Sequence, residues 1–381
     1  MVAHEPIDVT LITSFGDPGG GSELVVASYL DHCREALRVR AIMLQRGPLE
    51  GVLRELGAEV AVHPTGASPL AILGAGRPLT RDLRAHRPQV VVANGVKAMT
   101  AVAMPARALG LPTVWLKMDH SYDRPLARPL GWLSTSVVAT AMEVGLPTGR
   151  DDVVDIEPAR PDEPLPRADA VAELVRRGYD PTRQATLVMI GRVVPYKGVD
   201  VAIKSLAFSE AVGWRLAVIG GVDPATPDEL DRLKALAAVL GVADRVDFLG
   251  PIPAAGRLIR AFTALAVLTR PGQSRAPTRE GFGITATEAM LGSVPVIMAG
   301  EGPVARRLRT PHGLAGVVVR QSNPGDVAKA LARLTDSEQR RRMGAAGRAA
   351  AQAHPDAADA AGRWLAVVQA ASRHGGAKMG A

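Results

Sequence analysis

Several common features are missing from the chain of 381 residues, and each absence excludes some classes of protein. Its one cysteine, Cys33, allows no internal disulfide and no cysteine-based metal cluster. No run of 18 or more apolar residues occurs, so no segment is predicted to span a membrane. The first residues have neither a basic segment nor a small-residue cleavage site, and they predict a strand instead of a signal peptide. We expect a cytoplasmic protein, with Cys33 packing on the helix after the first strand.

Aromatic residues are also scarce, and charge is unevenly distributed. At 3% aromatics, stacking platforms for nucleic acid are few, so no nucleic-acid partner is expected. Residues 1–180 hold 19 Lys+Arg and 22 Asp+Glu, whereas the remainder holds 26 and 16. The basic second half suits a polyanion such as a nucleotide diphosphate. The acidic first half favours a neutral or cationic soluble ligand over membrane association, although Arg81, Arg84 and Arg87 could form a lipid-facing strip.

Short apolar runs alternate with helix-like segments in both halves of the chain. This pattern predicts an α/β protein with parallel sheets covered on both faces. We expect two doubly wound Rossmann-like domains, at residues 1–165 and 166–354, joined near a proline-rich stretch at 156–167. Residues 355–381 are expected to form a C-terminal helix, from Asp356 to about Ala371, that packs back on the first domain and ends in a frayed tail.

A glycine-rich turn follows the first predicted strand. In "SFGDPGGGSEL" the amides of Gly19, Gly20 and Gly21 could face an anion at the start of a helix, although a plain tight turn explains the sequence equally well. The stretch is not a G-x-G-x-x-G, and Gln45 and Arg46 stand where a dinucleotide site would place an acid after the second strand. We therefore do not expect a dinucleotide to bind there.

Two cations follow a strand in the second half. In "GRVVPYKGVD", Arg192 and Lys197 are five residues apart, and a helix is expected to begin near Val199. Two cations at a helix start could neutralise a diphosphate without a metal ion. Taken alone, the same residues are more simply explained as surface charges.

The stretch "REGFGITATE" contains two carboxylates, Glu280 and Glu288, on either side of a Gly-Phe-Gly turn. At eight residues' separation they would lie about 80° apart around a helix axis and would not share one face. We therefore expect Glu280 to project from the loop and Glu288 from the helix, each reaching a different part of one ligand, although two solvated acids at a helix start are the alternative. The amides of Gly283, Ile284 and Thr285 would point from the helix start.

Together these motifs resemble the retaining glycosyltransferases of family four, which have the GT-B architecture of two Rossmann-like domains facing across a cleft. The resemblance runs from about Thr186 to Arg348 and rests on "GRVVPYKG", "LAVIGG", "GVADRVDFLGPIP", "EGFGITATEAMLGSVPVI" and "RRMGAAGR". In the first half it rests on "PGGGSE", the strand order and "MDH". Two departures stand out: the loop before Glu280 is lengthened to "TRPGQSRAPTRE", and "VDIEPAR" replaces the usual linker motif.

The resemblance implies a role for each motif. Glu280 would bind hydroxyls of the donor sugar, Glu288 the ribose, and Arg192 and Lys197 the diphosphate. The remaining donor contacts would come from the glycine-rich turn, from residues beside the base, and from the backbone of the Gly-Phe-Gly turn and the helix start after it. These residues are Gly19, Gly20 and Gly21; Pro251 and Ile252; and Phe282, Gly283, Ile284 and Thr285.

His120 follows the strand-like "TVWLKMD", and a family histidine near this place lies close to the acceptor and the reacting carbon. A lone histidine is otherwise often a packed residue. With Arg192, Lys197 and Glu280, His120 completes the candidate catalytic set, and Asp17, Asp119 and Asp123 are weaker candidates for acceptor contacts.

The resulting hypothesis is retaining transfer of a hexosyl unit from a nucleotide sugar, by default a UDP-sugar, to a hydroxyl group. The acceptor is expected to be small, soluble and possibly amine-bearing, such as an aminocyclitol of an antibiotic pathway; a lipid or cell-wall acceptor at a membrane is the alternative. No metal or other cofactor is expected, because no Asp-x-Asp lies beside a strand end. A GT-B epimerase or phosphorylase, an NAD(P)-dependent dehydrogenase and a non-catalytic sugar-nucleotide sensor are the competing hypotheses.

Overall fold

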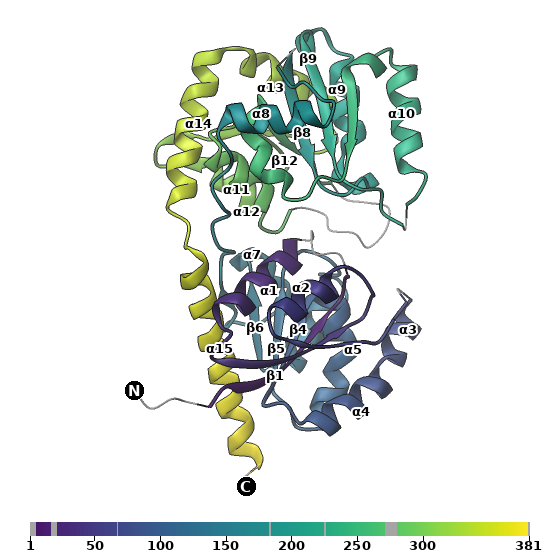
Figure 1. The fold of residues 1–381 in the computed structure, drawn as a ribbon, viewed down its shortest axis with the longest axis vertical. Helices are drawn as coiled ribbons and strands as arrows, with labels where there is room; N and C mark the ends of the chain where they lie inside the picture. Colours follow the sequence, from purple (N-terminus) through teal and green to yellow (C-terminus); the bar gives the residue numbers. More distant parts are fainter. Residues whose placement is uncertain are drawn as a thin grey trace. The chain divides into compact units, whose positions relative to one another are not determined.

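A computed structural model of the protein describes residues 5–16, 21–66, 68–182, 184–224, 226–270 and 280–379, without the side chains of 375–379. The chain folds into two compact units, both drawn in Figure 1. Unit 1 comprises Met1–Ala159 and Pro355–Ala381, and unit 2 comprises Arg160–His354. The division after Ala159 falls within the proline-rich stretch, slightly before the boundary at 165 expected from the sequence.

Unit 1 is built on a seven-stranded parallel sheet with the order β3-β2-β1-β4-β5-β6-β7. Its strands, in chain order, are β1 (Ile7–Thr13), β2 (Leu37–Met43), β3 (Glu59–Val62), β4 (Val90–Asn94), β5 (Thr113–Lys117), β6 (Ser136–Ala139) and β7 (Val154–Asp155). Its helices are α1 (Gly21–His32), α2 (Leu49–Glu55), α3 (Pro69–Gly74), α4 (Gly76–His86), α5 (Gly95–Ala108), α6 (Ala127–Leu133), α7 (Met142–Gly145), a 3-10 turn (Leu146–Thr148) and α15 (Ala357–Met379).

Unit 2 has a six-stranded parallel sheet with the order β10-β9-β8-β11-β12-β15 and a short antiparallel β13-β14 hairpin. The strands are β8 (Ala185–Ile190), β9 (Trp214–Ile219), β10 (Val246–Gly250), β11 (Ala264–Val267), β12 (Val296–Ala299), β13 (Arg309–Thr310), β14 (Gly313–Leu314) and β15 (Gly316–Val319). The helices are α8 (Arg167–Arg176), α9 (Val199–Leu206), α10 (Glu229–Val239), α11 (Ile284–Leu291), α12 (Pro303–Arg307), α13 (Pro324–Thr335) and α14 (Ser337–Gln352), with 3-10 turns at Pro195–Lys197, Ser209–Ala211, Ala243–Arg245 and Ala255–Ala261.

The central strands form where the sequence has uninterrupted apolar runs. Every residue of β4 and of β5 is buried, as expected for a parallel sheet covered on both faces. In unit 1, α3, α4, α5 and α6 pack side by side on one face of the sheet, while α1 and α15 pack together on the other. The prediction of two doubly wound Rossmann-like domains is therefore confirmed, and it places the carboxyl ends of each set of strands along one edge.

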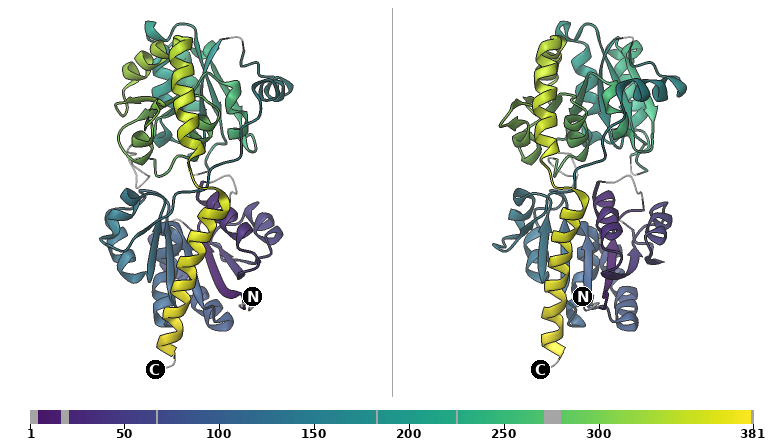
Figure 2. Two further views of the ribbon diagram at one scale, coloured as in Figure 1. Left: turned by 90° about the vertical axis from the view of Figure 1, so that its left-hand side faces the viewer. Right: turned by 60° about the vertical axis from the view of Figure 1, so that its left-hand side comes forward.

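The C-terminal helix α15 packs on unit 1, as Figure 2 shows. Tyr29 of α1 and Trp364 of α15 stack with ring centroids 5.3 Å apart. Cys33, the first residue after α1, is buried, and its thiol donates to the carbonyl of Ala361 at 3.7 Å. The predicted end near Ala371 was wrong, because α15 continues to Met379: once a helix is nucleated, each further residue adds a hydrogen bond.

Among the helices of the described residues, none has the length and apolar composition that a membrane crossing requires.

Candidate functional site

The strand order of unit 2 reverses between β8 and β11, which is where open parallel sheets bind ligands. After β8 the chain leads into α9, whose N-cap residue is Gly198, and beyond β11 it leads into α11, whose N-cap residue is Gly283. Both glycines have a left-handed backbone, with φ of 76° and 72°. A Cβ on Gly198 would lie 2.5 Å from the carbonyl oxygen of Leu268, so glycine is required for this close approach.

The two helix starts provide hydrogen-bond donors at this edge. The first N–H groups of a helix have no partner within the helix and carry partial positive charge. In α11 these groups belong to residues 283–285, as the sequence predicted, and the side chain of Thr285 lines the same cavity as Arg192 and Lys197. This edge can therefore accept an anionic group.

Lys197 and Glu280 form an ion pair inside this cavity. Lys197 Nζ lies 3.0 Å from Glu280 Oε2, and the hydroxyl of Thr269 donates to the same oxygen at 2.8 Å. Burial alone would raise the pKa of Glu280, but Lys197 and Thr269 outweigh it and hold this pKa below its usual value. Burial likewise opposes the charge of Lys197, yet Glu280 holds its pKa above the usual value. Both groups are therefore charged.

Arg192 lies on the same cavity but is already paired. Its guanidinium contacts the carboxylate of Asp223 and donates to the Tyr196 hydroxyl at 3.1 Å. From the sequence, Arg192 and Lys197 were predicted to bind one anion together. Their acidic partners, Asp223 and Glu280, were not predicted, because these residues lie far from them along the chain. The structure instead shows two ion pairs, Arg192–Asp223 and Lys197–Glu280.

Phe282 belongs to the core of unit 2, and its ring is packed on both sides. The guanidinium carbon of Arg307 lies 3.9 Å from the ring centroid, and His354 makes an edge contact at 5.9 Å. Arg307 also donates to the carbonyl of Phe282 and to the hydroxyl of Thr287 at 3.2 Å. Sequence reasoning missed Arg307, which holds the Gly-Phe-Gly turn against α11.

Glu288 projects from the second turn of α11, separate from Glu280 in the loop, as the sequence predicted. Burial raises the pKa of Glu288 to about 7. Its carboxylate lies against Gly256, where a Cβ would be 1.9 Å from a carboxylate oxygen. Sequence reasoning missed Gly256, because 32 residues separate the two positions in the chain. A carboxylate in this setting gains stability from any ligand hydroxyl groups that donate to it.

Pro251 and Ile252 follow β10 at the same edge of the sheet. Pro251 is exposed and faces Gly221, whose Cβ would lie 4.0 Å from that of Pro251. Ile252 is partly buried against the core.

In unit 1 a second group of charged side chains follows β5. His120 Nδ1 lies 3.0 Å from Asp123 Oδ2, and Lys117 Nζ donates to Asp123 Oδ1 at 2.6 Å and to the carbonyl of Asp119 at 2.7 Å. His120 and Lys117 are buried, and His120 Nε2 has no hydrogen-bond partner among the described residues. Burial opposes the charge of Asp123, but His120 and Lys117 hold its pKa below the usual value.

This geometry fixes one property of His120. In a neutral imidazole, the Asp123 carboxylate facing Nδ1 holds the proton on that nitrogen, and Nε2 then carries the lone pair. The sequence singled out His120, Asp119 and Asp123 but not Lys117. Asp119 Oδ1 accepts from the N–H of Ser121 at 2.8 Å, so part of its hydrogen-bonding capacity is already used.

The glycine-rich loop of unit 1 is described only at its end. Gly21 is the first residue of α1, whereas Asp17, Gly19 and Gly20 lie outside the described residues, as do residues 271–279 of the lengthened loop before Glu280. Next to Gly21, the buried Glu23 accepts from the Ser22 hydroxyl at 2.6 Å and from the Asn94 amide at 3.4 Å.

Comparison with known proteins gives matches in sequence and in fold. Residues 173–350 match the family model of the group 1 glycosyl transferases. The chain is 30% identical over 234 residues to a D-inositol 3-phosphate glycosyltransferase of Acidothermus cellulolyticus, an alignment that covers 57% of this chain and 50% of that protein. The chain thus spans about half the length of such relatives.

Two solved structures share the fold over nearly the whole chain. The structure of Anabaena Alr3699/HepE in complex with UDP and glucose has a TM-score of 0.79 at 20% identity and covers 96% of this chain and 100% of that one. Sucrose-phosphate synthase from Thermosynechococcus elongatus has a TM-score of 0.76 at 17% identity and covers 95% and 98%. These likenesses show a GT-B fold.

Proposed function

We propose that the protein is a retaining glycosyltransferase that transfers a hexosyl unit from a nucleotide sugar, with a UDP-sugar favoured, to an acceptor hydroxyl. The observation that carries the proposal is the edge of unit 2, where the starts of α9 and α11 and the Lys197–Glu280 pair meet at one cavity, with the carboxylate of Glu288 in the next turn of α11. Cations and helix N-termini suit a diphosphate, and separate carboxylates suit two sets of hydroxyl groups. The family match over residues 173–350 supports the same chemistry.

The roles are those that the family resemblance implies, and the charge of each group suits its role. Lys197, Arg192 and the amides of α11 would hold the diphosphate and stabilise the charge that develops as it leaves. Glu280, kept ionised by Lys197, would accept from sugar hydroxyls, and Glu288 from the ribose. In the front-side mechanism that the family resemblance implies, the departing diphosphate takes the acceptor proton, so the protein contributes positioning and electrostatic stabilisation.

For the acceptor we propose a small soluble molecule, such as an aminocyclitol, contacted from unit 1 by His120 Nε2. Asp123 is engaged by Lys117 and His120, which leaves Asp119 as the better amine partner of the two. A lipid or cell-wall acceptor is the second candidate, and the arginines exposed on one side of unit 1 favour it.

A thermal-shift screen against UDP-, GDP-, ADP- and dTDP-sugars tests the donor side, with Lys197→Ala as the site variant and Lys329→Ala, on α13 of the same unit, as the control. We expect one nucleotide class to stabilise the wild-type protein and the control but not Lys197→Ala. Equal stabilisation of all three proteins would refute the assigned site.

Acceptor trials with the best donor then test transfer on a panel of aminocyclitols and lipid-linked acceptors. Isomerisation of the donor without an acceptor would favour an epimerase instead. Tight binding of NAD(P)H without nucleotide-sugar binding would favour a dehydrogenase.

A further inference from the structure

One face of unit 1 combines positive charge with exposed apolar side chains. It is the outer surface of the layer formed by α3, α4, α5 and α6, which pack side by side on the sheet. Leu79 and Leu83 of α4 and Met99 of α5 point into the core beneath. We call the solvent-exposed surface of these four helices, within residues 68–133, the arginine face (Figure 1).

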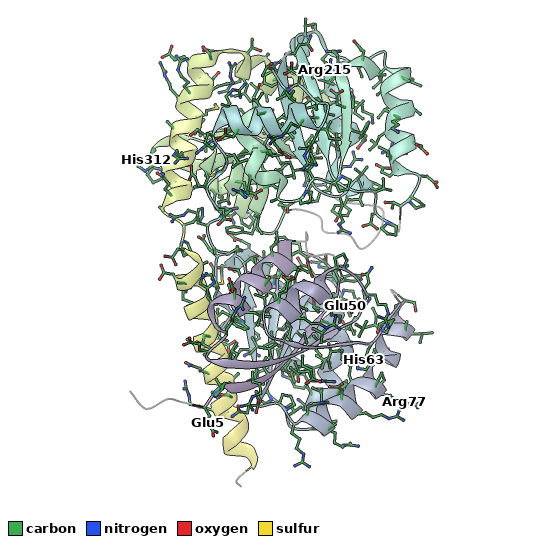
Figure 3. The ribbon with its side chains drawn as sticks, viewed as in Figure 1. Glu5, Glu50, His63, Arg77, Arg215 and His312 are labelled. Atoms are coloured by element: carbon green, nitrogen blue, oxygen red, sulfur yellow. The ribbon has the colours of Figure 1, made fainter. Side chains whose placement is uncertain are left out.

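Every exposed charged side chain of this stretch is basic. Besides His86, it carries seven exposed arginines: Arg77, Arg81, Arg84, Arg87, Arg107, Arg124 and Arg128. The three acids of the stretch are not exposed, since Asp82 pairs with Arg40, Asp123 with Lys117 and His120, and Asp119 accepts from a backbone N–H. No carboxylate within the described part of the chain pairs with any of the seven, and Figure 3 shows Arg77 pointing away from the unit.

Large apolar side chains are interleaved with these arginines. Leu70 and Leu73 of α3 are 82% and 61% exposed, Met104 of α5 is 62% exposed, and Trp132 of α6 is 77% exposed. A Cβ on Gly76 would lie 3.6 Å from Cγ of Pro105, so the start of α4 lies against the turn of α5 that carries Met104. Single exposed apolar residues are ordinary, but four on one helical layer among unpaired arginines are not.

Arg107 and Trp132 place a positive charge in direct contact with an exposed aromatic ring. The Arg107 guanidinium lies over the Trp132 ring, 5.7 Å from its centroid. An arginine beside an exposed tryptophan suits the bilayer interface, where the ring lies at the level of the headgroups and the guanidinium meets phosphate.

We propose that the arginine face docks on the headgroup surface of an anionic lipid bilayer. Anionic lipid attracts basic residues near its surface, and the exposed leucines, methionine and tryptophan can enter the boundary between headgroups and acyl chains. A nucleic acid would pair with the arginines but would leave Leu70 and Leu73 without a role, and the face offers one aromatic ring for stacking. The proposal concerns a surface distinct from the donor site and does not depend on the proposed activity.

Trp132 provides a built-in probe of docking. The other three tryptophans of the chain, Trp115, Trp214 and Trp364, are fully buried, so a change in emission on adding vesicles reports on Trp132. The full chain is mixed with vesicles of phosphatidylcholine alone, or with about one-third phosphatidylglycerol, at physiological ionic strength. We expect co-sedimentation and a blue shift with the anionic vesicles only, and no blue shift for Trp132→Phe.

Charge-reversal variants locate the contact. Arg77→Glu/Arg81→Glu/Arg84→Glu should lower the partition onto anionic vesicles by about 100-fold or more. The control Arg34→Glu/Arg38→Glu/Arg54→Glu changes the net charge equally, in the turn after α1, in β2 and in α2, and should keep most of the binding. Circular dichroism and thermal unfolding show whether each variant is folded. If the Arg77/Arg81/Arg84 triple variant does not fold, the single variant Arg84→Gln replaces it and is expected to bind several-fold less.

Three results would overturn the proposal. They are no binding of the wild-type chain to anionic vesicles, equal loss in both triple variants, and tight binding to duplex DNA without a Trp132 shift on vesicles. None of them bears on nucleotide-sugar binding, so failure of this proposal and failure of the proposed activity can be told apart.

Discussion

Glu288 is the residue whose chemistry depends most directly on pH. Burial raises its pKa to about 7, and hydroxyl donors from a ligand stabilise its ionised form. Ligand binding therefore releases a proton at low pH. Affinity should rise with pH, by up to about tenfold per unit, and level off above the free-protein pKa.

We expect Glu288→Gln to weaken nucleotide-diphosphate binding by roughly 1.5–3 kcal/mol and to flatten this pH profile. Calorimetry across pH 5–9 measures both effects, and the titration of the diphosphate itself cancels because it is the same for both proteins. Glu338→Gln, on the exposed surface of α14, is the control with no expected effect. If nucleotide affinity changed with pH in the same way in the wild-type protein and in Glu288→Gln, the assignment of Glu288 as a ligand contact would be contradicted.

Gly256 sets where that carboxylate can lie. A methyl group at 256 would overlap the end of the Glu288 side chain, which can rotate away, so Gly256→Ala should move the carboxylate without unfolding the unit. We expect about 1–3 kcal/mol weaker binding of the nucleotide, with little change in unfolding temperature. In the control, Gly51→Ala in α2, an added Cβ meets nothing within 4 Å. Unchanged nucleotide affinity in Gly256→Ala would show that nucleotide binding does not depend on the conformation of Glu288.

Asp123 compensates a fully buried cation. Lys117 has 0% exposed side-chain area and contacts Asp123 at 2.6 Å, so Asp123→Ala leaves a buried charge without its carboxylate. We expect unit 1 to lose roughly 3–5 kcal/mol of unfolding free energy, more than in Asp119→Ala, whose side chain accepts from a backbone N–H. Urea denaturation compares the two, and equal losses would show that the ion pair contributes nothing particular.

At the scale of elements, α15 completes unit 1 although it comes last in the chain. Trp364 is buried and stacks on Tyr29 of α1. Trp364→Ala should therefore destabilise unit 1 by about 3–5 kcal/mol, while Trp132→Ala, the same change at an exposed position, should cost little. Differential scanning calorimetry with and without UDP separates the units, because the ligand is expected to stabilise unit 2. A shift of the UDP-stabilised transition alone in Trp364→Ala would contradict this account.

At the scale of the whole molecule, charge is organised by face, and the count over half of the sequence does not reveal it. Residues 68–133 hold nine Lys+Arg and three Asp+Glu, although residues 1–180 together are net acidic. Most of the other acids of residues 1–180 lie on α1, on α2 and between positions 151 and 180. A surface acts through its local field over about 10 Å, so the face and not the half decides what it attracts.

The charges at the carboxyl edge of the unit 2 sheet also bear on whether the proposed activity requires a metal ion. If Lys197, Arg192 and the start of α11 neutralise the diphosphate, a divalent ion has no necessary part. Binding of UDP and turnover with the best donor should then be unchanged in EDTA, and added Mg²⁺ should not raise them. Activity lost in EDTA and restored by Mg²⁺ or Mn²⁺ would contradict this expectation.

The sequence alone determined the elements and the local geometry of the site. Buried runs such as those of β4 and β5 predict parallel strands, and a glycine before an apolar helix predicts the starts of α9 and α11. The separation of Glu280 in a loop from Glu288 on a helix also followed from spacing. These features depend on neighbours within a few residues, so the sequence contains them. The two-residue strands β7, β13 and β14 were missed, because such short segments have no periodicity to detect.

Only the tertiary structure decided which side chains meet. The pairs Lys197–Glu280 and Arg192–Asp223, and the contact of Gly256 with Glu288, join positions 31 to 83 residues apart. Strand order and crossover connections bring such positions together, and no local pattern encodes them. The same holds for the arginine face, because its arginines become one surface only when α3, α4, α5 and α6 pack in a layer with Leu79, Leu83 and Leu130 turned inward.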